Sequence, residues 1–151
     1  MNLERKYEAS RLPFFSHLHL LVVEPNASLR DLFCCISYVW NIKSTEVATF
    51  QEALHYLETH DLSEEVPLLL LDGSLDAPKV HAFLAQVRRQ KSYPYIVMTT
   101  GSDTTRWIER GIAVLQKPFH LSTLQDAISD VLLKAKTQPE ENHFTYASSH
   151  R

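Results

Sequence analysis

The stretch that decides the fold is LLVVEPNASLR, residues 20–30. It begins with four aliphatic residues, reaches a carboxylate at Glu24, and continues through Pro25, which has no backbone N–H to donate. Such a run is typical of a parallel strand that is covered on both faces and whose carboxyl end opens onto a crevice. The sequence therefore predicts a buried strand here, with Glu24 at the floor of the crevice.

Outward from this strand, short apolar runs alternate with longer segments of helical period. We predict strands at 18–23, 45–48, 67–71, 95–98 and 112–115, and helices at 28–40, 51–59, 78–91, 103–110 and 122–136. Strict alternation of strand and helix is typical of an α/β fold, in which right-handed crossovers place helices on both faces of a doubly wound, five-stranded parallel sheet.

The length of 151 residues fits one ordinary domain. Residues 137–151 are polar and without apolar period, so we expect a flexible C-terminal tail. Residues 1–16 are expected to form an N-terminal arm, whose Leu12, Phe14 and Phe15 pack on the domain or on a partner. The domain itself is predicted to span 17–136.

Composition excludes several classes of function. The net charge is −3 and no basic block is present, which argues against binding to nucleic acid or to an anionic membrane. No apolar run approaches the roughly 20 residues that span a bilayer, and the first residues lack the apolar core of a secretory signal. We expect a cytoplasmic protein.

The two cysteines, Cys34 and Cys35, are adjacent in a predicted helix and point in different directions, so neither a structural disulfide nor a CxxC metal site follows. We predict two small buried residues. The eight histidines include His17 and His19 on one face of a strand, but no cysteine or acid accompanies them, which favours solvated or edge histidines over zinc. The chain has no glycine-rich nucleotide motif and no GxSxG hydrolase motif.

Polar side chains follow the predicted strands at their carboxyl ends, where ligands bind in open α/β sheets. They are Glu24, Asp72, Thr99 with Thr100, and Lys117. An aspartate can attack phosphorus to form an acyl phosphate, a lysine can pair with the phosphoryl oxygens, a hydroxyl can donate to them, and acids can hold a divalent metal.

Four motifs at these strand ends are similar to those of a known family. They are LLVVE (20–24), LLLLD (68–72), PYIVMTTG (94–101) and LQKPF (115–119). In this order and spacing the chain, from 18 to 136, resembles the receiver domains of two-component response regulators. LQKPF is the most specific motif, and the resemblance implies a cis peptide bond before Pro118.

The resemblance implies a flavodoxin-like fold with strand order 2-1-3-4-5 in a three-layer α/β/α sandwich. Asp72 would be the phospho-acceptor, Thr99 the switch hydroxyl and Lys117 the phosphate-pairing amine, with a weak Mg²⁺ site at Glu24 and Asp72. Such a chain would be a signalling protein in a phosphorelay and not an enzyme. Its expected partners are a histidine kinase or phosphotransfer protein, a downstream effector, and a second copy bound through the surface of the fourth helix, fifth strand and fifth helix.

The sequence also departs from the family pattern. The family places two acids at the end of the first strand, but here Pro25 follows Glu24 and supplies no side-chain oxygen, which predicts weakened Mg²⁺ binding. Val114 stands where the family usually has an aromatic ring. The interval from Thr99 to Lys117 is short, which predicts a short fourth helix or a tight loop before it. The loop after Asp72 lacks the usual turn residues.

Two hypotheses follow. The first is a stand-alone receiver that accepts phosphate at Asp72; the second is a phosphorylation-independent pseudo-receiver that serves as an interaction or dimerisation module, with Asp72 paired to Lys117. Metal affinity discriminates between them. Trp107 is expected in the helix–sheet core, with an exposed anchor for a partner as the alternative.

Overall fold

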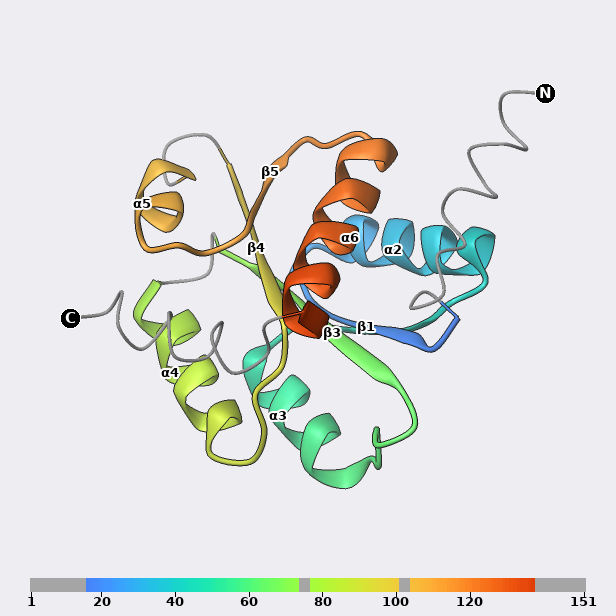
Figure 1. Ribbon diagram of the computed structural model, residues 1–151, viewed down its shortest axis with the longest axis vertical. Helices are drawn as coiled ribbons and strands as arrows, with labels where there is room; N and C mark the ends of the chain where they lie inside the picture. The colour runs from blue at the N-terminus through green and yellow to red at the C-terminus, as the bar shows by residue number, and fades with distance from the viewer. Residues whose placement is uncertain (1–15, 74–76, 101–103, 138–151) are drawn as a thin grey trace. The chain divides into compact units, whose positions relative to one another are not determined.

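The computed structural model describes residues 16–73, 77–100 and 104–137. The predicted arm, apart from Ser16, and the predicted tail, apart from Thr137 at the end of α6, lie outside the described residues. In the described ranges five strands form one sheet of order β2-β1-β3-β4-β5, the flavodoxin-like order, and five helices connect or follow them (Figure 1). The chain divides into two compact units, residues 1–69 and 70–151, which are described separately below.

The first unit contains β1 (Leu18–Val23), α2 (Ala27–Trp40), β2 (Lys43–Val47) and α3 (Phe50–Thr59). β1 and β2 pair in parallel, with His19 opposite Lys43 and Val23 opposite Val47. All six residues of β1 are buried, because α2 and α3 cover opposite sides of it (Figure 1). The prediction of a strand covered on both faces is therefore confirmed.

Local side chains fix the ends of these helices. The side chain of Asn26 accepts a hydrogen bond from the Leu29 N–H at 3.0 Å and so begins α2, while Asn41, in the left-handed region with φ 56°, ends it. Thr49 begins α3 and exchanges hydrogen bonds with the main chain and side chain of Glu52, both at 3.1 Å. The turns on either side of β2 are thus specified locally.

The second unit begins within β3 (Val66–Asp72) and contains α4 (Ala77–Arg88), β4 (Tyr95–Thr100), α5 (Thr104–Glu109), β5 (Val114–Lys117) and α6 (Leu121–Thr137). β4 pairs in parallel with β5, and Thr100 lies opposite Lys117. In Figure 1, α4 and α5 lie on one side of β4 and α6 on the other. Four residues of α4 form its buried stripe: Val80, Phe83, Leu84 and Val87. The short fourth helix is confirmed as the six-residue α5, and Trp107 on it is buried.

Two strands are displaced from their predicted positions. β5 runs from Val114 to Lys117 instead of 112–115, because the Ile112 N–H bonds back to the carbonyl of Trp107 and keeps the chain in a turn. Gly111, at φ 74°, provides the left-handed residue of this turn. β2 begins two residues earlier than predicted, at Lys43, where its pairing with β1 begins.

The outer face of α2 also differs from its prediction. Cys34 and Cys35 are exposed, so the prediction of two buried cysteines was wrong. Leu32 is 45% exposed, whereas Phe33 and Ile36 are buried in the core. None of the helices in the described part of the chain combines the length and apolar character of a membrane span.

Candidate functional site

Asp72 and Lys117 form the centre of the site in the second unit. Asp72 is the last residue of β3 and Lys117 the last residue of β5, so two strand ends bring them together. The Lys117 ammonium donates to Oδ1 of Asp72 at 3.2 Å, and the two side chains are only 17% and 1% exposed. The Lys117–Pro118 peptide bond is cis, as predicted. A buried carboxylate is therefore held beside a cation at the carboxyl end of the sheet.

Thr99 lies near the end of β4, one residue before the partner of Lys117. Its side chain is buried, and its hydroxyl donates to the main-chain carbonyl of Thr100 at 3.4 Å. Thr100 is exposed and lies opposite Lys117 in the register. The structure thus places the predicted hydroxyl on the strand beside β5, directed toward the main chain.

Gly73 follows Asp72 at a position where no side chain would fit. Its N–H donates to the carbonyl of Met98 on β4. A methyl group built on Gly73 would lie 2.6 Å from Cγ1 of Val97 and 2.9 Å from the Met98 oxygen, and 3.4 Å from the indole nitrogen of Trp107. Sequence reasoning missed the position of Trp107 beside Gly73. A glycine directly after Asp72 indicated that a side chain would not fit here, but it did not identify Trp107 as the residue that fills the space.

Glu24 belongs to the first unit, at the end of β1, and its carboxylate is engaged within its own loop. It is 1% exposed, and its Oε2 accepts the N–H of Asn26 at 3.0 Å. The guanidinium of Arg30 donates to the carbonyls of Glu24 and Pro25 at 2.8 and 2.9 Å. These contacts stabilise the loop that follows β1, while the exposed Pro25 contributes no side-chain oxygen.

The residues that the structure describes do not make a strong Mg²⁺ site. Mg²⁺ requires near-octahedral oxygen ligation. Within residues 16–73, 77–100 and 104–137, no group of three or more His, Cys, Asp or Glu side chains could hold a metal ion. Asp72 is paired with Lys117, and the Glu24 carboxylate accepts a main-chain N–H. The donor set therefore fits the ion poorly.

A buried histidine in the first unit was also missed. The prediction of solvated or edge histidines was wrong for His19, which is 5% exposed. Its Nε2 lies 2.8 Å from Oγ1 of Thr45 and its Nδ1 lies 3.2 Å from Oε1 of Glu65. Its ring also packs edge-on against Tyr56. Partners from distant parts of the sequence satisfy this ring, which is why the local pattern did not reveal it.

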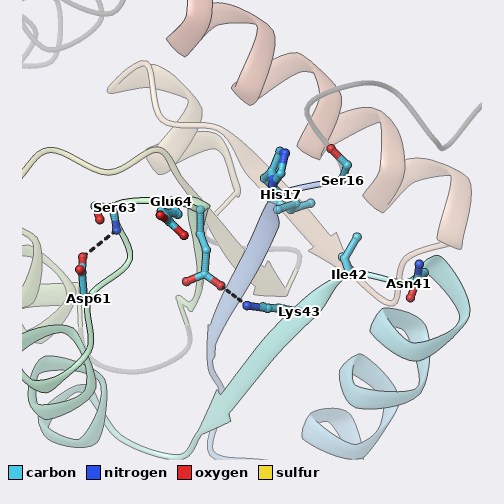
Figure 2. A pocket seen from close by; sticks show the side chains of 10 residues that line it. Ser16, His17, Asn41, Ile42, Lys43, Asp61, Ser63 and Glu64 are labelled. Carbon is cyan, nitrogen blue, oxygen red and sulfur yellow. Dashed lines mark hydrogen bonds and ion pairs between the residues drawn. The ribbon is translucent and has the colours of Figure 1, made fainter.

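Glu65, which contacts His19, also lines a polar pocket of about 730 Å³ beside the start of β1 and β2. Figure 2 shows this pocket. The Lys43 ammonium contacts Oε1 of Glu65 at 3.0 Å on the pocket wall, where Asp61 and Glu64 also lie. Burial alone would raise the pKa of Glu65, but hydrogen bonds from Lys43 and His19 outweigh it and hold this pKa below its usual value of 4.5. The carboxylate therefore stays ionised near neutral pH.

Solved structures share this architecture. A response regulator receiver protein from Pseudomonas putida superposes with a TM-score of 0.62 at 19% identity, covering 76% of this chain and 97% of that one. A response regulator receiver protein from Burkholderia phymatum gives 0.59 at 21% identity, covering 76% and 94%. The chain has the receiver fold.

NtrX from Brucella abortus gives a TM-score of 0.66 at 21% identity. That match covers 83% of this chain but 28% of NtrX, so the receiver fold corresponds to a part of that longer protein. No family model matches the chain, and no curated protein matches its sequence. At these identities the likeness concerns the fold.

Proposed function

We propose that this chain is a two-component receiver module, in which Asp72 is the phospho-acceptor position and the signal passes to other proteins by direct contact. The observation that carries the proposal is the shielded pair of Asp72 and Lys117 at the carboxyl ends of β3 and β5. In a receiver fold this edge of the sheet is where a ligand binds. Thr99 lies on the strand beside β5, as a switch hydroxyl should.

The chemistry would be a phosphoryl transfer from a phosphohistidine of a histidine kinase or phosphotransfer protein. A carboxylate oxygen of Asp72 forms a bond to phosphorus as the P–N bond breaks, and the leaving imidazole nitrogen keeps the electron pair and takes a proton from solvent. Lys117 moves from pairing with the carboxylate to pairing with the phosphoryl oxygens. The Thr99 hydroxyl donates to one of these oxygens.

Metal binding in this proposal is weak. Mg²⁺ is the ion that receivers use, and when bound it would offset charge on the phosphoryl oxygens. Glu24 and Asp72 are the side chains assigned to it. Because Pro25 supplies no ligand and Glu24 is already hydrogen-bonded to Asn26, we expect this chain to need more Mg²⁺ than a receiver with two acids after its first strand.

The module would act through partners and not as an enzyme. The proposed contact surface consists of α5, β5 and α6, where a downstream effector or a second copy would bind. Three large apolar side chains support this proposal because they lie in solvent on these helices: Ile108 is 57% exposed, Leu121 51% and Leu133 53%. The cytoplasmic location expected from the sequence stays a prediction.

A second candidate function is the phosphorylation-independent pseudo-receiver. Two observations favour it: Pro25 stands in place of an acid, and the Glu24 carboxylate accepts the Asn26 N–H. In that case the pair of Asp72 and Lys117 would only stabilise the scaffold, and the same surface would bind partners without a phosphoryl switch.

Incubation with a small phosphodonor such as acetyl phosphate in Mg²⁺ separates the two candidates. The receiver proposal predicts that intact-protein mass spectrometry shows one added phosphoryl group, which alkali removes as expected for an acyl phosphate. Asp72→Asn is the acceptor control and Asp126→Asn, an exposed acid on α6, the matched one. An adduct that persists in Asp72→Asn, or none at any Mg²⁺ concentration, would reject Asp72 as the acceptor.

A further inference from the structure

The indole nitrogen of Trp107 faces the space beside Gly73, the residue that follows Asp72. Trp107 is 1% exposed, and its indole nitrogen is 3.4 Å from the position that a methyl group on Gly73 would take. The same methyl group would also meet Val97 and the Met98 oxygen of β4, and the Gly73 N–H donates to that oxygen. The space beside Gly73 is therefore closed by β4 and by the indole of Trp107. Interiors packed in this way transmit small displacements because they have few voids.

The main chain of Trp107 holds the turn between α5 and β5. Its carbonyl accepts the N–H of Arg110 at 3.1 Å and that of Ile112 at 3.2 Å. The next residue, Ile108, is 57% exposed and accepts the N–H of Gly111 at 2.9 Å. A displacement of the indole ring would therefore move a turn that reaches the surface.

The side chain of Trp107 also contacts a polar pair that joins α5 to α4. Its ring centroid lies 5.4 Å from that of His81, with the planes tilted by 35°. The guanidinium of Arg110, in the turn after α5, donates to Nε2 of His81 on α4. His81 and Arg110 are both partly exposed. Trp107 thus lies between the space beside Gly73 and the pair of His81 and Arg110 that joins α4 to the turn after α5.

We propose that Trp107 is the positioning residue through which a chemical change at Asp72 alters the outer surface formed by His81, Ile108 and Arg110. In the cell this coupling would be used only if the proposed function holds, because phosphorylation would then be the change at Asp72. The coupling can still be tested with any other change to the Asp72 carboxylate. β5 carries no aromatic ring at Val114 that could serve instead.

A double-substitution cycle tests the coupling without a phosphoryl group. Asp72→Asn removes the charge beside Lys117, and the amide chemical shifts of His81, Ile108 and Arg110 report the surface. We expect Asp72→Asn to shift these amides in the protein that contains Trp107. In the Trp107→Phe background, which keeps an apolar ring but loses the indole nitrogen that faces Gly73, the shifts should fall to less than half.

The control for general loosening of the core is Leu132→Ala on α6, also buried at 4%. In that background the response to Asp72→Asn should be unchanged. His81→Ala tests the outer half separately, and there Arg110 should lose its response while Gly73 keeps it. If Trp107→Phe does not fold, the emission of Trp107 in the protein with Trp40→Phe, compared with and without Asp72→Asn, decides whether the ring responds to the change. Equal responses with Trp107 or Phe, no response at the surface amides, or an unchanged Arg110 response in His81→Ala would overturn the proposal.

A second measurement separates failure of the coupling from failure of the proposed function. Trp40→Phe leaves Trp107 as the single tryptophan, and beryllofluoride with Mg²⁺ serves as the phosphoryl probe. Bound fluoride detected by ¹⁹F NMR, together with a change in Trp107 emission, is expected. Bound fluoride with unchanged emission contradicts the coupling. Absence of bound fluoride contradicts the phospho-acceptor role, and the double-substitution cycle continues to decide the coupling.

Discussion

The Lys117 ammonium lies 3.2 Å from Oδ1 of Asp72, and this pair is almost completely shielded from water. Lysine and aspartate come from strands 45 residues apart in sequence. Removing one partner of a buried pair leaves an uncompensated charge, which is far more destabilising than loss of an exposed pair.

Lys117→Met should therefore destabilise the fold by about 3 kcal/mol, because the Asp72 carboxylate would stay buried without its cation. Urea unfolding measures the difference. The matched control is Lys43→Met, which removes the cation of the Lys43–Glu65 pair; that lysine is 73% exposed, and its loss should cost less than about 1 kcal/mol. Equal effects of the two substitutions would show that the Asp72–Lys117 pair contributes no more than a surface pair.

Gly73→Ala tests the enclosure of the main chain after Asp72. The added methyl group would come within 2.6 Å of Val97 Cγ1 and 2.9 Å of a main-chain oxygen that cannot rotate away. We expect a loss at the upper end of the roughly 1–3 kcal/mol typical of overpacking. Gly111→Ala is the comparison, since its methyl group meets nothing within 4 Å and the φ of 74° alone costs about 1 kcal/mol. A smaller loss at Gly73 than at Gly111 would contradict the described packing.

The lowered pKa of Glu65 predicts a specific loss of stability in acid. Burial raises this pKa, but the hydrogen bonds from Lys43 and His19 lower it more, so the folded protein binds this proton less readily than the unfolded chain does. The stabilisation is complete above the unfolded value of 4.5 and disappears as the pH falls through the lower folded value.

Thermal unfolding from pH 6 to pH 3 checks this prediction. The difference between the wild type and Glu65→Gln should be largest at pH 6 and should shrink below pH 4.5, whereas the exposed neighbour Glu64→Gln should show little difference across this range. A constant difference across the range would exclude Glu65 ionisation as its cause.

The exposed cysteines on α2 predict rapid thiol chemistry. Both Cys34 and Cys35 should react with a thiol reagent in the native protein at rates close to those in denaturant, because neither side chain is covered. Counting the thiols modified before and after denaturation measures this. Protection of either cysteine in the native state would indicate that the outer face of α2 is covered in solution.

These residues also show how far the sequence predicts the structure. β1 was predicted to the residue, because its apolar run is bounded by polar residues and covered on both faces. The solvent-exposed face of α2 was not predicted correctly, because the segment from Leu32 to Trp40 carries no charged residue that would mark it. The apolar residues Ile112 and Ala113 were included in the predicted fifth strand, but the Ile112 N–H bonds to the carbonyl of Trp107 in the turn after α5.

Of the candidate site, only the residues at the ends of the strands could be predicted from the sequence. Asp72 and Lys117 end strands whose neighbourhood follows from the sheet order, and their pairing was anticipated. The position of Trp107 beside Gly73, and the pairing of His19 with Glu65, depend on tertiary packing between distant segments. No local period or motif encodes such contacts.

The most direct test of the central claim is an amide NMR titration of the protein with Mg²⁺ and then beryllofluoride, carried out in parallel on Pro25→Asp. If Asp72 is the phospho-acceptor of a receiver with weakened metal binding, saturable shifts will spread from Asp72 to Thr99 and Lys117, and Pro25→Asp will reach saturation at a lower Mg²⁺ concentration. Spectra that stay unchanged in both proteins at millimolar Mg²⁺ with beryllofluoride would contradict the claim and leave a receiver fold used as a binding surface.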